Sequence, residues 1–315
     1  MNALVTGVAG FIGSHLAETL LARGAQVTGI DCFTDYYPRT IKESNLEGAR
    51  RNPAFRLVES TIQAADLPAL LQGTTHVFHL AAQAGVRRSW GRDFRVYTVN
   101  NIEATQVLLE ACKAAPLDRL VYASSSSVYG DEAALPMRED SLPRPVSPYG
   151  VSKLAAEQLC YLYHVNYGVP AVSLRYFTVY GPRQRPDMGF HKFLKAALRG
   201  QPIEIFGDGE QTRDFTFVAD AVEATIAAGV RGKVGRVYNI GGGSRVSVNH
   251  VLDVIRSVTN LDVIVRRVDE QKGDMRDTYA DTSLARADLA FAPAATLATG
   301  LAAEYEWLAG VEARG

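Results

Sequence analysis

The fold of this chain is decided by the stretch Ala3-Leu4-Val5-Thr6-Gly7-Val8-Ala9-Gly10-Phe11-Ile12-Gly13 near its start. The residues before the first glycine predict a short strand, and Leu16, Leu20 and Leu21 form a helical stripe that ends at Gly24. The glycines therefore lie at a strand-to-helix turn, where backbone can approach a pyrophosphate and the helix N-terminus stabilises its charge. Their spacing, G-x-x-G-x-x-G, is a weak indication of a dinucleotide site when taken alone.

A carboxylate at the end of the next predicted strand strengthens that indication. The strand Gln26–Ile30 ends at Asp31, eighteen residues after Gly13, where an acid is expected to bind the hydroxyls of an adenosine ribose. The same charge would repel a 2′-phosphate, so the sequence favours NAD over NADP. Arg39 and Lys42 follow closely and keep NADP open as an alternative.

Further strands and helices alternate along the chain. Together with the glycine turn they predict an α/β fold of the Rossmann type, a doubly wound parallel sheet whose ligands lie beyond the carboxyl ends of its strands. The predicted strands and helices are 55–58, 77–80, 96–115, 120–123, 149–168 and 171–175.

The pattern changes after Pro182, and a smaller, mostly C-terminal α/β substrate lobe is expected there. We predict an NAD-binding domain at 1–176, rejoined by 214–245, and a nucleotide-sugar-binding lobe at 177–213 and 246–315. The elements expected in this half are strands at 203–206, 237–240 and 262–266 and helices at 220–229 and 248–259. The arginines that could face one anionic ligand there are Arg183, Arg185, Arg213 and Arg276.

The composition excludes several classes of partner. Of 315 residues 47% are hydrophobic and 21% are charged, and the net charge is −1, so neither nucleic acid nor an anionic membrane is an expected partner. No apolar run approaches the ~20 residues of a membrane span, and no signal peptide is expected. The cysteines Cys32, Cys112 and Cys160 fit neither a metal site nor a disulfide framework, and they suit a reducing cytoplasm.

The candidate chemistry lies between Tyr122 and Lys153. Tyr149 and Lys153 are four residues apart and so share one face of a helix. A nearby ammonium favours the phenolate and draws its pKa towards the working pH. The preceding strand leads into a run of hydroxyls, Ser124 to Ser127, one of which could bind a substrate oxygen or relay a proton. Such a group removes the proton of an alcohol while its hydride leaves.

These residues resemble the extended short-chain dehydrogenase/reductase family, the nucleotide-sugar epimerases and dehydratases, over nearly the whole chain. The shared motifs are Thr6-Gly7-x-x-Gly10-Phe11-Ile12-Gly13, His79-Leu80-Ala81-Ala82, Tyr149-x-x-x-Lys153, Arg175-Tyr176, Tyr180-Gly181-Pro182, Gly207-Asp208-Gly209 and Thr212-Arg213-Asp214-Phe215. The resemblance implies NAD as cofactor, held by Gly7, Gly10, Phe11, Ile12, Gly13, Asp31, Leu80, Ala81, Ala82, Asn100, Tyr149, Lys153 and Tyr176.

The activities within this family divide at the serine run. Sugar 4,6-dehydratases carry Asp-Glu where Ser126 and Ser127 stand, and UDP-glucuronate decarboxylases carry Glu at the second position. Neither acid is present, which leaves the 4-epimerase arrangement with Ser125 as the active hydroxyl and Tyr149 and Lys153 as the other catalytic residues. Three segments are similar to UDP-glucuronate 4-epimerases in particular: 82–87, Asp35-Tyr36-Tyr37, and 177–182 followed by 185–188.

The resemblance implies a UDP-sugar substrate and a homodimer formed through the helices 96–115 and 149–167. Arg213 and Arg276 are expected on the diphosphate and Ile205 and Phe206 beside uracil. The substrate-binding residues implied are Arg87, Ser125, Ser126, Ser127, Tyr149, Thr178, Arg185, Ile205, Phe206, Arg213 and Arg276.

Two segments depart from the family pattern, and several readings stay open. Ser60-Thr61 replaces an Asp near adenine, and Gln271-Lys272 replaces an Arg-Pro pair. The first alternative function is a UDP-glucose or UDP-N-acetylglucosamine 4-epimerase, although such enzymes usually carry Asn where Thr178 stands. The others are a non-catalytic NAD-binding sensor, which the Tyr–Lys pair disfavours, and a reductase that exchanges NADP(H), which Asp31 disfavours.

Overall fold

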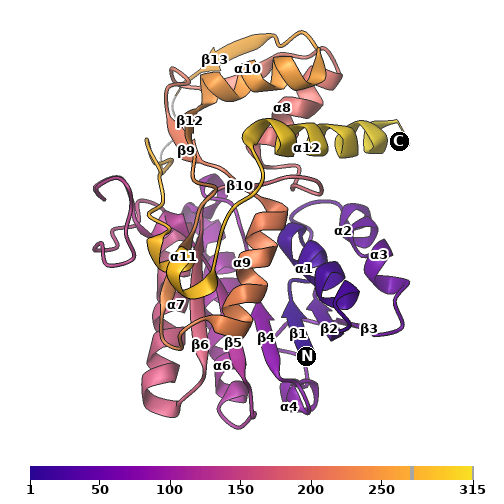
Figure 1. Cartoon of the computed structure of the whole chain (residues 1–315), viewed down its shortest axis with the longest axis vertical. Coiled ribbons are helices and arrows are strands. Elements are labelled where there is room, and N and C mark those ends of the chain that lie inside the picture. The colour runs from indigo at the N-terminus through magenta and orange to yellow at the C-terminus, as the bar shows by residue number, and fades with distance from the viewer. Residues whose placement is uncertain (270–272, 314–315) are drawn as a thin grey trace.

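The computed structural model describes residues 1–269 and 273–313, and its centre is a seven-stranded sheet (Figure 1). Each adjacent pair of strands is parallel, and the order across the sheet is β11-β6-β5-β4-β1-β2-β3. This confirms the predicted Rossmann-type α/β fold. The strands are β1 (Asn2–Thr6), β2 (Gln26–Asp31), β3 (Phe55–Glu59), β4 (His76–His79), β5 (Arg119–Ser125), β6 (Ala171–Tyr176) and β11 (Val237–Ile240).

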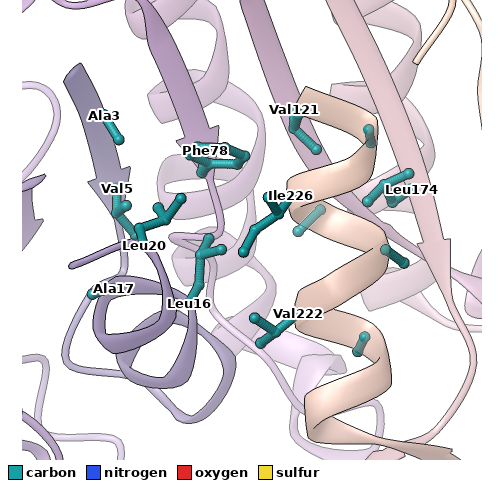
Figure 2. Packing of buried hydrophobic residues seen from close by; sticks show 14 of the residues in the cluster. Ala3, Val5, Leu16, Ala17, Leu20, Phe78, Val121, Leu174, Val222 and Ile226 are labelled. Atoms are coloured by element: carbon teal, nitrogen blue, oxygen red, sulfur yellow. The ribbon is translucent and has the colours of Figure 1, made fainter. Parts of the chain in front are cut away.

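Helices cover both faces of the sheet because its central strands are apolar on both sides. Leu16 and Leu20 of α1 (Phe11–Ala22) and Val222 and Ile226 of α9 (Val218–Arg231) face one side, as Figure 2 shows. The opposite side is packed by α4 (Leu67–Leu71), α6 (Ala104–Cys112) and α7 (Pro148–Tyr167). Short helices and turns connect these elements: α2 (Arg39–Asn45), α3 (Glu47–Arg50), η1 (Arg87–Ser89), η2 (Gly91–Asp93) and η4 (Ser126–Val128).

The helix expected at 96–115 is not a uniform α-helix. Its first part is α5 (Phe94–Tyr97), followed by a π-helical segment, η3 (Thr98–Glu103), before α6. Asn101 explains the wider turn. Its side chain bonds both backbone groups of Gln83, at 2.7 and 3.0 Å, and the hydroxyl of Ser152 at 2.8 Å. The π-helical segment accommodates the Asn101 side chain, which bonds the loop after β4. The periodicity of apolar residues does not reveal such a bulge.

The second lobe is built from separated segments and lies above the carboxyl ends of the main strands (Figure 1). Strand β8 (Ile203–Phe206) pairs in parallel with β13 (Val265–Val268), and β9 (Thr212–Asp214) pairs antiparallel with β12 (Arg245–Ser247). Strand β13 thus begins three residues later than the strand predicted at 262–266. The remaining elements are α8 (Gly189–Leu198), α10 (Val248–Thr259), α12 (Leu297–Glu312) and the short pair β7 (Val179–Tyr180) and β10 (Thr216–Phe217).

Two segments of the C-terminal half pack with the main sheet. Strand β11 pairs with β6, and α9 belongs to the cluster of apolar side chains on α1. Ala285 and Leu289 of α11 (Ser283–Leu289) belong to the same cluster. We therefore propose a domain division in which residues 283–291 accompany the sheet, rather than the lobe to which the range 246–315 assigned them.

Candidate active site

The glycine turn forms a backbone cradle that leaves no room for side chains at Gly7 and Gly13. Gly7 has a φ of +70°, and a Cβ there would lie 2.8 Å from the Ala81 nitrogen. A Cβ on Gly13 would lie 2.2 Å from the Gly7 oxygen. The Ala81 nitrogen donates to Thr6 Oγ1 at 3.1 Å, which fixes the loop after β4 against the turn. Because α1 starts directly after Gly10, its N-terminus is available to an anion, and these residues fit a dinucleotide pyrophosphate.

One pocket follows the cradle along the carboxyl ends of the strands. Its lining includes every residue that the family resemblance assigned to the cofactor, namely Gly7, Gly10, Phe11, Ile12, Gly13, Asp31, Leu80, Ala81, Ala82, Asn100, Tyr149, Lys153 and Tyr176. Ser60 and Thr61, which stand where the family usually has an acid, also line it. Their presence agrees with the rule that ligands of doubly wound sheets lie at this edge.

The end of the pocket at Asp31 is acidic. Its carboxylate accepts hydrogen bonds from the backbone nitrogens of Ala9 at 3.0 Å and Phe33 at 2.8 Å, while burial raises its pKa. The basic residues that kept NADP open have partners within the protein, although Lys42 also lines the pocket. Arg39 makes two 2.7 Å bonds to Glu59, and the buried Lys42 donates to the Thr34 oxygen at 2.7 Å.

Sequence reasoning did not select several lining residues of this end. These residues are Cys32, Thr34 and Gln63. They lie in the loops after two predicted strands, and that position was the one signal available.

Tyr149 and Lys153 lie on the first two turns of α7, which Ser147 caps by accepting from the Gly150 nitrogen at 3.1 Å. The Ser125 hydroxyl lies close enough to the Tyr149 phenol to influence its pKa, and the Tyr149 ring meets the ring of Tyr97 edge-on with 6.3 Å between centroids. Lys153 is 3% exposed, and its Nζ lies 4.7 Å from the centre of the Tyr122 ring. The strand end and the helix thus bring the predicted phenol, amine and hydroxyl into one place.

The electrostatics of this site correct one expectation. Burial raises the pKa of Tyr149, while the Ser125 hydroxyl and the charge of Arg185 act in the lowering direction. Burial also lowers the pKa of Lys153 to about 8, against the opposing effects of Cys160 and Glu157. In the protein alone, burial therefore outweighs the effects of Ser125 and Arg185, so the pKa of Tyr149 is raised rather than lowered as the sequence predicted.

Hydroxyl side chains lie at the carboxyl ends of β5 and β6. Ser125 Oγ accepts from the Ser127 nitrogen at 3.1 Å, which shapes the turn after β5. Ser126 is buried, and Thr178 is half-buried directly after β6, the neighbour of β5. The predicted Ser125, Ser126, Ser127 and Thr178 therefore follow the ends of two adjacent strands. Arg185 lines the pocket with Tyr149.

Arg87, Arg213 and Arg276 lie near one another at the second lobe. The predicted Arg183 instead bonds Glu18 of α1 at 3.0 and 2.9 Å. Arg87 lies over the ring of Phe206, with its Cζ 3.9 Å from the ring centre. Arg213 Nη1 donates to the backbone oxygen of Arg276 at 3.0 Å, and Asp274 and Arg87 are among the charges that act on Arg213. Four separate segments thus bring three guanidinium groups and one aromatic ring together, with Asp274 and Asp208 as the ion-pair partners of Arg87 and Arg276. Guanidinium groups beside an aromatic ring suit a nucleoside diphosphate.

Ile205 does not belong to this group of side chains. It is 1% exposed and packs against Ile203 and Leu252, because alternate residues of β8 face opposite sides. This packing disfavours the prediction that the Ile205 side chain flanks uracil, and Phe206 is the β8 side chain under Arg87. Gln271 and Lys272, which replace the family's Arg-Pro pair, lie outside the described residues.

A glycine-lined cradle on a parallel sheet, with a Tyr–Lys pair and a serine beside it, defines the short-chain dehydrogenase/reductase class of enzymes. A family model described as "NAD dependent epimerase/dehydratase family" matches residues 3–241. The chain belongs to this family. Within the described residues no group of three or more His, Cys, Asp or Glu side chains could hold a metal. Likewise, none of the described helices is long and apolar enough for a bilayer.

Comparisons with individual proteins point to sugar-nucleotide epimerases. The chain is 45% identical to an uncharacterized UDP-glucose epimerase of Bacillus subtilis (strain 168), YtcB, across 98% of each chain. It is 38% identical to a UDP-glucuronate 4-epimerase of Thermodesulfobacterium geofontis, across 96% of this chain and 95% of that protein. A solved structure of UDP-glucuronic acid 4-epimerase from Bacillus cereus, in complex with UDP-glucuronic acid and NAD, matches with a TM-score of 0.96 and 45% identity over 99% of this chain and 100% of that one.

Proposed function

We propose that the chain is an NAD-dependent UDP-sugar 4-epimerase that interconverts UDP-glucuronate and UDP-galacturonate. The observation that carries this proposal is that Tyr149 and Lys153 line the pocket that fits a dinucleotide, with the Ser125 hydroxyl close enough to act on the Tyr149 phenol. The absence of acids at Ser126 and Ser127 disfavours dehydration and decarboxylation. The similarity to proteins named UDP-glucuronate 4-epimerase, over nearly the full length, supports the choice of substrate.

In this mechanism Tyr149 is the base and acid for the sugar 4-hydroxyl. NAD, when bound in this pocket, would supply a hydride acceptor and, for the return step, a hydride donor. Tyr149, as phenolate, takes the 4-hydroxyl proton, and Ser125 holds the oxygen and can relay that proton. Lys153 orients the nicotinamide ribose and favours the phenolate. The 4-keto sugar rotates about its pyrophosphate link, and Tyr149 returns the proton when the opposite face is reduced.

The carboxylate of the sugar needs its own partners. The 4-keto intermediate is a β-keto acid, which loses carbon dioxide when the breaking bond aligns with the carbonyl. We propose that Ser126, Ser127, Thr178 and Arg185 bind the carboxylate out of that alignment. Ser126, Ser127 and Thr178 follow the adjacent strands β5 and β6, and Arg185 lines the pocket with Tyr149. These positions support the role, because a buried carboxylate without partners is costly.

We further propose that Arg213 and Arg276 bind the diphosphate and that Phe206 and Arg87 flank the uracil. Arg276 already makes bonds of 3.0 and 2.8 Å to Asp208, and Arg87 Nη2 lies 2.6 Å from Asp274. These carboxylates hold the guanidinium groups in place before a ligand binds. Because the side chains are already oriented, they lose less conformational entropy on binding.

Replacing Ser125 by alanine should shift the pH dependence of the reaction. The Ser125 hydroxyl lowers the pKa of Tyr149, so Ser125→Ala raises that pKa further and leaves less phenolate at a given pH. The acid limb of the kcat–pH profile should move to higher pH, and kcat near neutrality should fall on the order of tenfold, equivalent to about one pKa unit. Steady-state kinetics across pH would measure this.

The matched control for that experiment is Ser257→Ala, which removes an exposed hydroxyl from α10. It should leave the profile unchanged. An unaltered profile for Ser125→Ala would remove Ser125 from the proton path.

A panel of UDP-sugars tests the proposed function. Purified enzyme should convert UDP-glucuronate to UDP-galacturonate, detected by chromatography, without added cofactor and without net change in the absorbance of added NAD or NADP. Conversion of UDP-glucose or UDP-N-acetylglucosamine alone would favour the second candidate, which the name of the Bacillus subtilis relative supports. Net oxidation or reduction of added cofactor would instead identify a dehydrogenase.

Two further proposals concern the assembly and its location. Helix α7 leaves Val151, Leu162 and Val165 45%, 50% and 59% exposed, and Val96 of α5 is 44% exposed. We propose that these apolar side chains lie in a homodimer interface, which light scattering of the purified protein would test. The free cysteines support a cytoplasmic location.

A further inference from the structure

Three loops meet above the catalytic pocket at a small polar junction. They are the loop after β2 with Tyr36, the loop after β4 with Gly85 and Arg88, and the loop before α8 with Arg185 and Asp187. The Tyr36 hydroxyl donates to Asp187 Oδ2 at 3.1 Å, although 151 positions separate the two residues. We call this contact, with Arg185, the Tyr36–Asp187 junction.

Asp187 fixes one edge of the Arg185 guanidinium. Arg185 Nε lies 2.9 Å from Asp187 Oδ1, and Nη2 lies 3.0 Å from Oδ2. The side chains are only 21% and 30% exposed. This geometry engages the Nε–Nη2 edge, so a ligand carboxylate can pair with the Nη1–Nη2 edge. Arg185 lines the same pocket as Tyr149.

Tyr36 is itself held from two sides. A Cβ on Gly85, whose φ is +101°, would lie 2.4 Å from the Tyr36 hydroxyl oxygen, so only glycine admits the hydroxyl at this place. On the other side, the Arg88 guanidinium lies 5.2 Å from the centre of the Tyr36 ring. The junction is therefore assembled from the loops after two strands of the sheet and the loop that enters the second lobe.

Charge also favours the junction. Asp187 is partly buried, which alone would raise its pKa, but Arg185 and the Tyr36 hydroxyl outweigh burial and hold that pKa below its usual value. Burial and the negative charge of Asp187 raise the pKa of Tyr36 to about 12, so Tyr36 stays a donor at neutral pH. The carboxylate thus remains charged, and its partners remain protonated.

We propose that Asp187 and Tyr36 are positioning residues that hold the Nη1–Nη2 edge of Arg185 towards the carboxylate of the sugar. This inference rests on the proposed function and assigns it two further residues. With the junction intact, the bond from C5 of the β-keto acid to its carboxylate stays out of alignment with the 4-keto carbonyl. With Arg185 displaced, the bond from C5 to the carboxylate breaks, its electron pair forms an enolate at the 4-oxygen, and C5 takes up a proton. The products are carbon dioxide and a 4-keto pentose, still attached to UDP.

The test compares ligands with and without the carboxylate. Asp187→Asn removes the charge and one acceptor, and Tyr36→Phe removes the hydroxyl alone. In each NAD-loaded variant the Kd for UDP-glucuronate, measured by calorimetry, should rise about tenfold, the size expected for a misplaced charge-assisted contact, while the Kd for UDP-glucose stays constant. Turnover of UDP-glucuronate should also release carbon dioxide, together with the UDP-4-keto pentose or the UDP-pentose that forms when the hydride returns to C4, at a higher ratio to epimer than wild type does.

Asp140→Asn is the matched control. Asp140 pairs with Arg138 at the same spacing, through Nε at 3.1 Å and Nη2 at 3.5 Å, but both side chains are exposed and neither lines the catalytic pocket. It should behave as wild type.

Three results would overturn the inference. One is unchanged Kd values and products in both variants, and another is equal weakening of both ligands, which a purely structural role predicts. The third result applies if Asp187→Asn does not fold. In that case, wild-type Kd values and products for Tyr36→Phe would overturn the inference. Failure of the proposed function is a separate result, because it would appear as a wild-type enzyme that does not epimerise UDP-glucuronate.

Discussion

Tyr149→Phe should lower kcat by about 10²–10⁴-fold, the usual contribution of a positioned general base, while the protein keeps its NAD. Phenylalanine retains the ring that meets Tyr97 at 6.3 Å and removes the hydroxyl on which Ser125 acts. The glycine cradle and Asp31 are untouched, so cofactor binding should persist. Product formation from UDP-glucuronate gives kcat, and the cofactor released on denaturation gives the fraction of protein that carries NAD.

Tyr161→Phe is the control for this variant. Tyr161 lies on the same helix, α7, is 56% exposed, and does not line the catalytic pocket. Its loss of a hydroxyl should leave kcat unchanged. A Tyr149→Phe enzyme with nearly full activity would transfer the role of base to another group, and loss of bound NAD would make Tyr149 a binding residue first.

Glu157→Ala should destabilise the fold by about 3–5 kcal/mol, the usual cost of leaving one charge of a buried ion pair without its partner. The Glu157 side chain is 2% exposed and that of Arg175 is 3% exposed. Glu157 accepts from Arg175 at 3.0 and 2.6 Å and from the Ser124 hydroxyl at 2.6 Å. Denaturant titration would give the free energy of unfolding, and weaker activity should accompany it because Ser124 precedes Ser125.

The contrast for that variant is Asp253→Ala on α10. Asp253 pairs with Arg256 at 2.7 Å, but the side chains are 68% and 44% exposed, so solvent already screens the pair. Its removal should leave the unfolding free energy within experimental error. An equally small change for Glu157→Ala would mean that Arg175 finds other partners when Glu157 is lost.

Local patterns were sufficient for much of the fold. The predicted helix 248–259 and the strand 237–240 match α10 and β11 at both ends, because a periodic apolar stripe and a short β-branched run each determine one element. The pattern failed at 96–115, where Asn101 bonds a loop distant in sequence and widens the helix. It also placed β13 early, because that strand is defined by its pairing with β8.

The candidate site was predictable where its residues follow strand ends. Gly7, Asp31 and Ala81 line one pocket because parallel strands end at one edge of the sheet. Tertiary contacts were not predictable. The sequence of a short strand does not show whether Ile205 faces the core or a ligand. No local pattern relates Tyr36 to Asp187. The raised pKa of Tyr149 likewise depends on burial, which a four-residue spacing does not convey.

Strand β11 has a consequence for how the chain is made. Its residues, 237–240, complete the sheet beside β6, and α9 covers Val121 and Leu174 on one face. When the ribosome has released only the first 176 residues, the side of β6 that later pairs with β11 has no partner, and the apolar face with Val121 and Leu174 is exposed to solvent. A nascent chain at this stage is therefore open to strand addition by a neighbour, and only after residue 240 emerges is the edge closed.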